Sequence, residues 1–272
     1  MNTTAHSQPL TAALDGVAFL GPGISTWTQL RSILRGAEPY HTAPTLIPPP
    51  ATLPPAERRR TGRIVNLALA AGYQATAGTG CDLATLATVY SSSGGDSNNC
   101  HEICQTLASA DRQLSPTRFH NSVHNVAAGY WGIATHDMAP STVVCAYDAS
   151  FAAGLLEALV QVSSGCPEVL LVSYDLNYPT PLYEKRPMPD SLAVGLLLRR
   201  DSGAHSVAIL SAALRQAEPE PMANPELENL RQQIPAARAL PLLARVAQGG
   251  ASSCRLEYLS PLALEVQLKP CV

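Results

Sequence analysis

The sequence predicts an α/β fold, in which helices cover the faces of a β-sheet. Short apolar runs at 16–20, 169–173 and 192–198 have the length of buried strands. Segments with apolar residues at helical spacing separate several such runs, and this alternation is typical of a sheet with helices on its faces. The chain has 272 residues, of which 46% are hydrophobic and 14% charged, so it can bury a substantial core.

The first part of the chain predicts a strand, a short helix, an arm and a long helix. Gly21-Pro22-Gly23 ends the first strand as a tight turn, and Gly36 ends the helix that follows. The arm contains two proline clusters that neither a helix nor a central strand accommodates. The long helix begins at the basic cluster Arg58–Arg60, which we interpret as a solvated helix start. These elements are expected at 16–20, 26–34, 39–55 and 57–77.

The middle and the end of the chain continue the alternation. Small residues at 91–95 allow a tight turn between a strand and a helix. Further strands are expected at 84–90, 142–146, 169–173, 192–198 and 207–214, and further helices at 100–110, 150–161, 226–234 and 240–247. Residues 256–268 predict either a pair of short strands or one long strand.

Charge and hydropathy exclude several classes of partner. The net charge is −3 and the seven histidines are scattered, so no basic face predicts binding to nucleic acid or to an anionic membrane. No apolar run approaches the ~18 residues that a membrane-spanning helix needs. Residues 1–9 lack the basic start and apolar segment of an export signal, and the seven cysteines are therefore expected to be reduced thiols of a cytoplasmic protein.

Three local patterns resemble catalytic or metal-binding motifs without completing them. Gly21-Pro22-Gly23 lacks the third glycine of a nucleotide-binding loop. Cys100 and Cys104 enclose His101, but no second pair of ligands follows to complete a zinc site. His120 and His124 have the spacing that shares a helix face, where polar contacts are more common than metal binding. We expect neither a metal nor a cofactor.

Ser122 and His124 do not form a hydrolase pair on this interpretation. Two residues separated by one position on a helix point to different sides, and no Gly-x-Ser-x-Gly elbow accompanies them.

A series of separated motifs runs through most of residues 15–200. Ser115-Pro116, Asn125, Ala128-Gly129 and Ile133 are followed by Ala139-Pro140-Ser141, a strand and a helix of small residues. This order resembles the N-terminal half of the β-ketoacyl synthases, whose fold is thiolase-like. In that family the serine-proline turn opens a helix that packs across the dimer axis, and the next strand leads into an elbow that carries the nucleophilic cysteine.

A more specific resemblance is to the β-ketoacyl-synthase-like chain-length-factor proteins of aryl polyene biosynthesis, a polyketide and fatty-acid-like process. Five blocks carry it, at 55–60, 92–96, 118–125, 149–158 and 170–175. The resemblance implies an α/β, thiolase-like fold that corresponds mainly to the N-terminal half of a β-ketoacyl synthase, with a shortened C-terminal part.

The position of the family's nucleophile falls on an aspartate. In ketosynthases the cysteine lies ten residues before the alanine that matches Ala158 and seventeen before the glycine that matches Gly165, and both distances lead to Asp148. A carboxylate is a poor acyl acceptor and would be repelled by developing oxyanion charge. The alternative nucleophile is Cys145, which we expect to be an inert buried thiol in the strand interior.

The catalytic histidines of the family are also absent. A decarboxylating ketosynthase uses two histidines from its C-terminal half, whereas only His205 follows Arg200 here, outside either motif. We therefore expect a ketosynthase-like domain at 1–200 and a C-terminal extension at 201–272 that completes or caps the fold. The chain by itself is not expected to be an enzyme.

The resemblance implies a heterodimer with a complete β-ketoacyl synthase. Arg118, Phe119, Ser122 and Val123 are expected to approach the acyl channel of that partner, and Tyr130 and Trp131 to pack within the subunit interface. The full set assigned to the interface and channel is Arg118, Phe119, His120, Ser122, Val123, His124, Asn125, Tyr130 and Trp131.

Two other functions stay open. The chain could be an active condensing enzyme or acyltransferase that uses Cys145, or a pseudoenzyme that binds an acyl carrier protein. Carrier proteins are acidic, so Arg58–Arg60 and Arg63 could serve as a contact for them.

Overall fold

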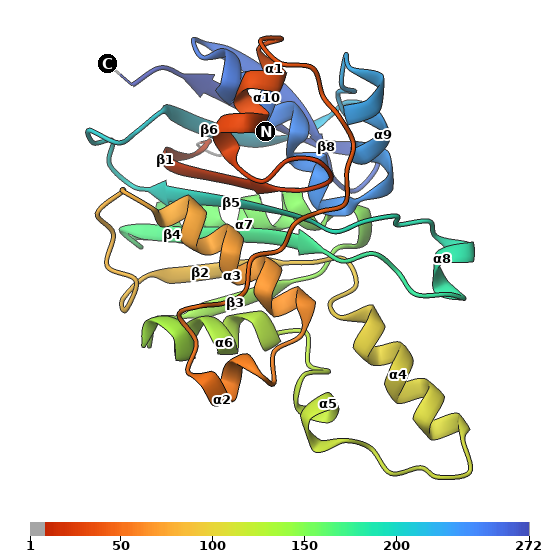
Figure 1. The fold of residues 1–272 in the computed structure, drawn as a ribbon. Coiled ribbons are helices and arrows are strands. Elements are labelled where there is room, and N and C mark those ends of the chain that lie inside the picture. Colours follow the sequence, from red (N-terminus) through yellow and green to blue (C-terminus); the bar gives the residue numbers. More distant parts are fainter. Residues whose placement is uncertain (1–8, 272) are drawn as a thin grey trace, which may run out of the picture.

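The protein was analysed as a computed structural model, which describes residues 9–271. In these residues one eight-stranded mixed sheet runs through the molecule in the order β3-β2-β4-β5-β1-β6-β8-β7 (Figure 1). Strand β2 is parallel to β3 and β4, and the other neighbours are antiparallel. The segment at 1–8, where no export signal is expected, lies outside the described residues.

The strands lie close to the predicted positions, and their bounds are β1 (Leu10–Leu20), β2 (Ala87–Ser91), β3 (Ser141–Val144), β4 (Glu168–Asp175), β5 (Leu192–Arg199), β6 (Ala208–Gln216), β7 (Ser252–Glu257) and β8 (Leu262–Lys269). Strands β7 and β8 form a hairpin, as in the paired alternative for 256–268, but β7 begins four residues before that segment, at Ser252. The last three strands extend the same sheet beyond β1. A domain division at residue 200 stays a prediction.

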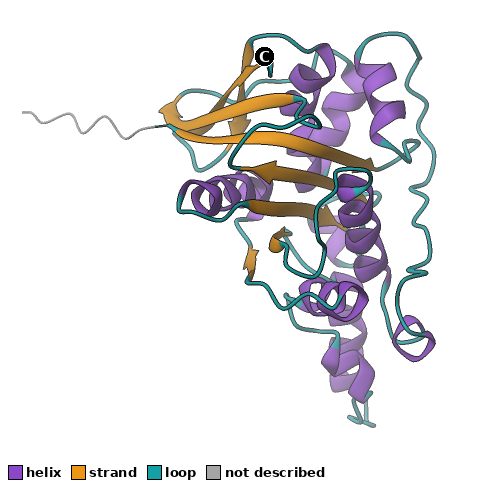
Figure 2. Cartoon of the chain, turned by 90° about the vertical axis from the view of Figure 1, so that its left-hand side faces the viewer, coloured by secondary structure: helices purple, strands orange, loops and turns teal. Residues whose placement is uncertain are grey.

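Helices pack on both faces of the sheet, as the α/β interpretation predicts (Figure 2). On one face α3 (Arg63–Thr76) and α6 (Val126–Thr135) enclose a cluster of buried side chains from β1, β2, β4 and β5. On the other face lie α7 (Ser150–Ser163), α10 (Leu240–Gln248) and the 3-10 turn η2 (Pro235–Ala239). The remaining helices are α1 (Trp27–Leu34), α2 (Pro55–Arg58), α4 (Ser97–Ala108), α5 (Pro116–His120), α8 (Leu182–Lys185) and α9 (Pro225–Gln233).

Two glycines let α3 lie unusually close to the sheet. A Cβ atom at Gly16 of β1 would lie 1.8 Å from the carbonyl oxygen of Ala75, and one at Gly195 of β5 would lie 2.6 Å from that of Ala71. Real Cβ atoms do not approach a carbonyl so closely. Any side chain at these positions would therefore push α3 off the sheet.

The prediction of one long helix at 57–77 is wrong, because this segment forms two separate helices. Helix α2 ends at Arg58, and α3 begins only after Gly62, whose backbone is extended. The Thr61 hydroxyl donates to the carbonyl of Arg58, and glycine is a poor residue inside a helix, so the chain turns at this point. The basic cluster at 58–60 lies on this exposed turn.

Helices α4 and α5 project from the body of the molecule (Figure 1). The Asp96 carboxylate caps α4 by accepting from Asn99 N at 3.0 Å, and the Ser115 hydroxyl caps α5. Helix α4 packs mainly on α5 rather than on the sheet. No helix among residues 9–271 is both long and apolar enough to cross a membrane.

Candidate functional site

The elbow between β3 and α7 is a strained turn. Tyr147 has a φ of 53°, which is rare for a residue with a side chain. The Ser150 hydroxyl fixes the turn, because it accepts from Ala146 N at 3.1 Å and donates to the carbonyl of Tyr147 at 2.7 Å. Asp148 follows Tyr147 in the 3-10 turn η1 (Tyr147–Ala149), which leads directly into α7.

Two arginines hold the Asp148 carboxylate. One oxygen pairs with Arg186, from the loop between β4 and β5, and the other lies 3.3 Å from a guanidinium nitrogen of Arg238, on η2. Arg238 is only 7% exposed and Asp148 only 32%. The carboxylate is thus neutralised by two positive charges at the position where a nucleophile is expected.

Arg186 is itself enclosed by the elbow and the loops around it. Its guanidinium carbon lies 3.8 Å from the centre of the Tyr147 ring, and one of its nitrogens donates to the Ser93 hydroxyl at 3.0 Å. The Tyr178 ring lies on another side, with its centre 5.8 Å away. These contacts leave the Arg186 side chain 19% exposed.

The expectation that Cys145 is a buried residue in the strand interior is wrong. Strand β3 ends at Val144, and Cys145 is the first residue of the exposed loop that follows. Its Sγ lies 3.2 Å from the carbonyl oxygen of Ser93. A carbonyl cannot accept the thiol proton as a base would, so this contact does not activate the sulfur as a nucleophile.

A second carboxylate lies in the core close to the elbow. Asp175, at the end of β4, accepts from Ser93 N at 2.8 Å and from Ala236 N at 2.9 Å, and the Ser92 hydroxyl donates to it at 3.3 Å. Burial raises the pKa of Asp175 to about 6, although these three hydrogen bonds favour the ionised form. Asp175 thus joins the 92–93 turn to η2.

The interpretation of His120 and His124 as neighbours on one helix is wrong. Helix α5 ends at His120 and α6 starts at Val126, so His124 lies in the connecting turn. The His120 ring is edge-on to Tyr130 at 6.4 Å, whereas the His124 ring lies against Gly95. Burial lowers the pKa of His124. Within residues 9–271 no three His, Cys, Asp or Glu side chains gather as metal ligands would.

An open apolar groove runs between α5 and α6. Its volume is about 520 Å³, and it includes several of the residues assigned to the partner interface. Phe119 is 67% exposed, Val123 51% and Ile133 40%, so three large apolar side chains gather on one surface. The lining residues are Pro116, Phe119, His120, Val123, Asn125, Val126, Gly129, Tyr130 and Ile133.

The other assigned residues lie around this groove or beneath it. Arg118 is exposed and pairs with Glu102 of α4 at 3.5 Å, and Ser122 is exposed on the turn after α5. Tyr130 and Trp131 are each only 1% exposed. Trp131 packs against Tyr73 of α3, with ring centres 5.1 Å apart, so these two aromatic residues support the groove from within the chain. Their contact with a partner stays a prediction.

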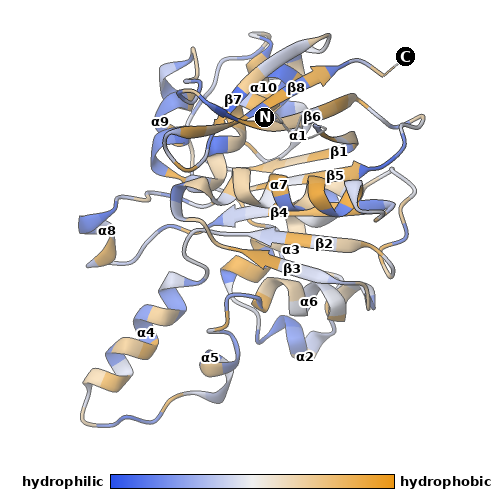
Figure 3. Cartoon of the chain, turned by 180° about the vertical axis from the view of Figure 1, so that it is seen from behind, coloured by the Kyte–Doolittle hydropathy of each residue, from blue (hydrophilic) through white to orange (hydrophobic). Residues whose placement is uncertain are grey.

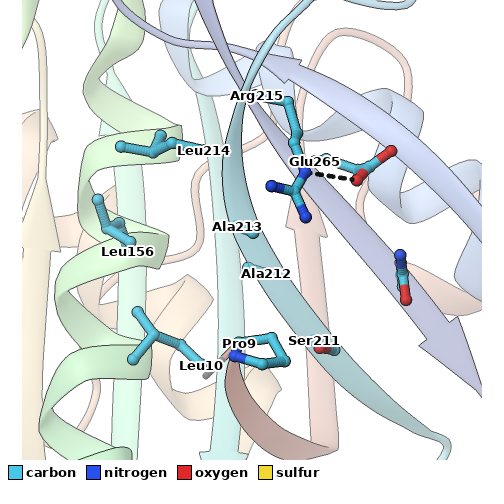
Figure 4. A pocket seen from close by; sticks show the side chains of 10 residues that line it. Pro9, Leu10, Leu156, Ser211, Ala212, Ala213, Leu214, Arg215 and Glu265 are labelled. Carbon is cyan, nitrogen blue, oxygen red and sulfur yellow. Dashed lines mark ion pairs between the residues drawn. The ribbon is translucent and has the colours of Figure 1, made fainter. Parts of the chain in front are cut away.

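A second groove lies on the opposite part of the sheet, between α7 and strand β6 (Figure 4). Its volume is about 430 Å³, and Leu10, Leu156 and Leu214 line it together with the ion pair between Arg215 and Glu265. Its lining, all within the described residues, holds neither a cysteine nor a histidine. The side chains there therefore offer no nucleophile and no general base of the histidine type.

Comparisons with known proteins agree with this fold. The sequence profile of the β-ketoacyl synthase N-terminal domain matches residues 27–257, which is most of the chain. The chain belongs to this family. It has the thiolase-like fold of the ketosynthase N-terminal domain. That Asp148 occupies the position of the family's cysteine stays a prediction.

Solved structures of ketosynthase complexes share the fold. One similar chain belongs to the structure of the ketosynthase ApeO in complex with its chain length factor ApeC from Xenorhabdus doucetiae. The sequence identity is 23% and the TM-score 0.71, and the match covers 95% of this chain and 99% of that chain. For the ishigamide ketosynthase/chain length factor the identity is 15% and the TM-score 0.73, with coverage of 96% and 100%.

A third similar structure is AntDE:AntF, a type II polyketide synthase acyl carrier protein in complex with its ketosynthase bound to the hexaketide. The identity is 12% and the TM-score 0.75, with coverage of 97% of this chain and 100% of that chain. No curated protein matches the sequence.

Sequence analysis missed the arginines that surround the ketosynthase-like elbow. Arg186 and Arg238 lie far from Asp148 along the chain, and both fall between the predicted helices and strands. One signal was present, because an aspartate in a partly buried elbow needs a positive partner. The sequence does not indicate which arginines provide it.

Proposed function

We propose that this chain is a noncatalytic chain-length-factor subunit that pairs with a complete β-ketoacyl synthase. The observation that carries the proposal is that Asp148, at the position where we expect the nucleophile, is paired with Arg186 and Arg238. A carboxylate held by two guanidinium groups is a weak nucleophile. The fold is shared with chains from complexes of a ketosynthase with its chain length factor, which supports the same assembly here.

The partner would bind the apolar surface on α4, α5 and α6. The groove between α5 and α6 exposes Phe119, Val123 and Ile133, and α4 adds Ile103 and Leu107, which recur at helical spacing on its surface. Figure 3 shows α4 as a projecting helix with hydrophobic segments among hydrophilic ones. Large apolar side chains that gather on one exposed surface are typical of a protein interface.

Strand β3 would continue the same interface. Among residues 9–271 it lies at the edge of the sheet and pairs with β2 alone, so within this part of the chain no strand covers its other side. Such an edge is stabilised when a strand or a loop of another chain covers it.

The role we assign to the chain is to shape the partner's acyl channel. Arg118, Phe119, Ser122 and Val123 lie on and after α5, the helix opened by the serine-proline turn. In the ketosynthase family this helix reaches the channel of the other subunit, and side-chain size there limits how far an acyl chain extends. By analogy we assign the product to aryl polyene biosynthesis, in the cytoplasm.

Co-purification tests the pairing. Phe119→Asp places a charge in the centre of the proposed interface, and we expect at least a tenfold weaker association with the ketosynthase, since apolar residues at the centre of an interface carry most of its binding energy. Leu259→Asp is the matched control, because Leu259 is 57% exposed at the far end of the sheet, on the β7–β8 turn. Equal binding by both variants would refute the proposed interface.

Mass spectrometry tests the catalytic alternative. The alternative is a condensing enzyme or acyltransferase, for which exposed Cys145 would have to carry the acyl group. After incubation with an acyl-loaded carrier protein we expect no acyl mass on the wild-type chain. An adduct that disappears in Cys145→Ser would establish the alternative.

A pseudoenzyme that only binds an acidic carrier protein through the exposed turn at 58–60 would bind the carrier without the ketosynthase.

A further inference from the structure

The Asp148 carboxylate joins three parts of the chain that are far apart in sequence. The elbow itself connects β3 to α7, Arg186 belongs to the loop between β4 and β5, and Arg238 belongs to η2 in the C-terminal segment. We propose that Asp148 is a structural anchor whose carboxylate fastens the 176–190 loop and η2 to the elbow.

The contacts of Arg238 show why the anchor extends into the C-terminal segment. Its Nε donates to Glu257 of β7 at 2.9 Å and another nitrogen donates to the carbonyl of Arg231 at 3.0 Å. Arg231 in turn pairs with Glu257 at 3.4 Å and Glu228 at 2.7 Å. Asp148 is therefore the terminal carboxylate of a charged network that starts on α9 and β7.

The contacts of Arg186 show why the anchor also includes the 176–190 loop. The loop is closed at its base by a hydrogen bond of 3.2 Å from Tyr178 N to the carbonyl of Met188, and both of these side chains are buried. The segment between them, including α8, projects outward (Figure 1). Arg186 is the residue of this projecting segment that reaches back to Asp148 and stacks on Tyr147. Removal of the carboxylate would leave Arg186 without its ionic partner and release the loop.

Charge balance at the anchor favours a carboxylate side chain at position 148. Arg238 is nearly buried, and a buried guanidinium without a full set of acceptors is costly. Glu257 is shared between Arg231 and Arg238, so Asp148 supplies the charge that Arg186 and Arg238 would otherwise lack. The position of the missing nucleophile thus acts as an anion site that the chain fills with its own side chain.

Chemical rescue of the full-length chain tests the anchor. Asp148→Gly removes the carboxylate and leaves a space between the two arginines, and we expect the melting temperature to fall by roughly 5 °C. Acetate should restore part of this loss, whereas chloride at the same ionic strength should not. The control is Glu265→Gln, which removes a 3.5 Å ion pair with Arg215, a side chain that is 62% exposed; it should change the melting temperature little and show no response to acetate.

Hydrogen exchange distinguishes the anchor from a local effect at the elbow. In Asp148→Gly we expect at least tenfold faster amide exchange both in 176–190 and in 235–239. If Asp148→Gly does not fold, Asp148→Asn keeps the shape, removes the charge, and should accelerate exchange in the same two segments. Unchanged exchange in both segments, or the same response to acetate and chloride, would overturn the proposal. Neither result affects the proposed pairing, because the anchor does not depend on a partner.

Discussion

The elbow around Asp148 and the projecting helices α4 and α5 use their side chains in opposite ways. At the elbow, charged groups are paired within the chain, and Arg186 has ionic, hydrogen-bonded and aromatic contacts at once. On α5 the large side chain of Phe119 faces solvent, and α4 packs mainly on α5. The difference teaches that the charged groups at the elbow find their partners within the chain, whereas α5 leaves a large apolar side chain exposed.

The largest effect should come from the packed support beneath the groove. Trp131→Ala removes a buried ring from α6 and should lower the free energy of unfolding by about 3–5 kcal/mol. Met138→Ala, at a residue that is 93% exposed, should lower it by less than ~0.5 kcal/mol. Urea unfolding measures both variants. Similar stabilities for the two would show that the groove is not built on a rigid core.

The buried carboxylate near the elbow should give the next largest effect. Because the folded-state pKa of Asp175 is raised to about 6, its protonation stabilises the fold below pH ~4, and this contribution is lost as the pH rises through 6. A difference of about 2 pKa units corresponds to roughly 2–3 kcal/mol. The measurement is the pH dependence of urea unfolding between pH 4 and 7.

Asp175→Asn is the comparison that isolates this carboxylate. The lowered pKa of His124 acts in the opposite direction, since it favours the fold above its titration range. The difference between wild type and Asp175→Asn removes that contribution. A difference that does not change with pH would contradict the burial of the Asp175 carboxylate beside the elbow.

The smallest effect on stability, and a large effect on the product, is expected at the exposed surface. Ser122→Phe adds volume on the turn after α5 and should change the free energy of unfolding by less than ~0.5 kcal/mol, because Ser122 is exposed. With the ketosynthase partner it should shift the products toward shorter chains, which mass spectrometry of the products measures. An unchanged product distribution would limit this surface to a role in holding the dimer together.

The sequence predicted the sheet well where single strands carry their own signal. The apolar runs at 16–20, 169–173 and 192–198 are long enough to identify a buried strand without knowledge of its neighbours. The division of the 57–77 segment was missed, because Thr61 and Gly62 break a helix only weakly in a periodic segment. The turn at His124 was missed because residues 121–125 contain neither a proline nor a glycine that would break a helix.

The candidate site was predictable in part. Its position followed from sequence distances to Ala158 and Gly165, and several assigned residues do share one groove. The ionic partners of Asp148 were not predictable, since they depend on how the 176–190 loop and η2 fold back over the elbow. Tertiary contacts of this kind leave no periodic pattern in the sequence.

The two glycines under α3 also provide a way to find further proteins of this kind. Gly16 and Gly195 are required by the distance between a helix and two strands, and that requirement does not depend on which residue stands at position 148. A genome survey that searches for an intact nucleophile overlooks such chains. A survey that searches for this pair of glycines, with an aspartate at the elbow, would retrieve them as candidates for testing beside neighbouring ketosynthases.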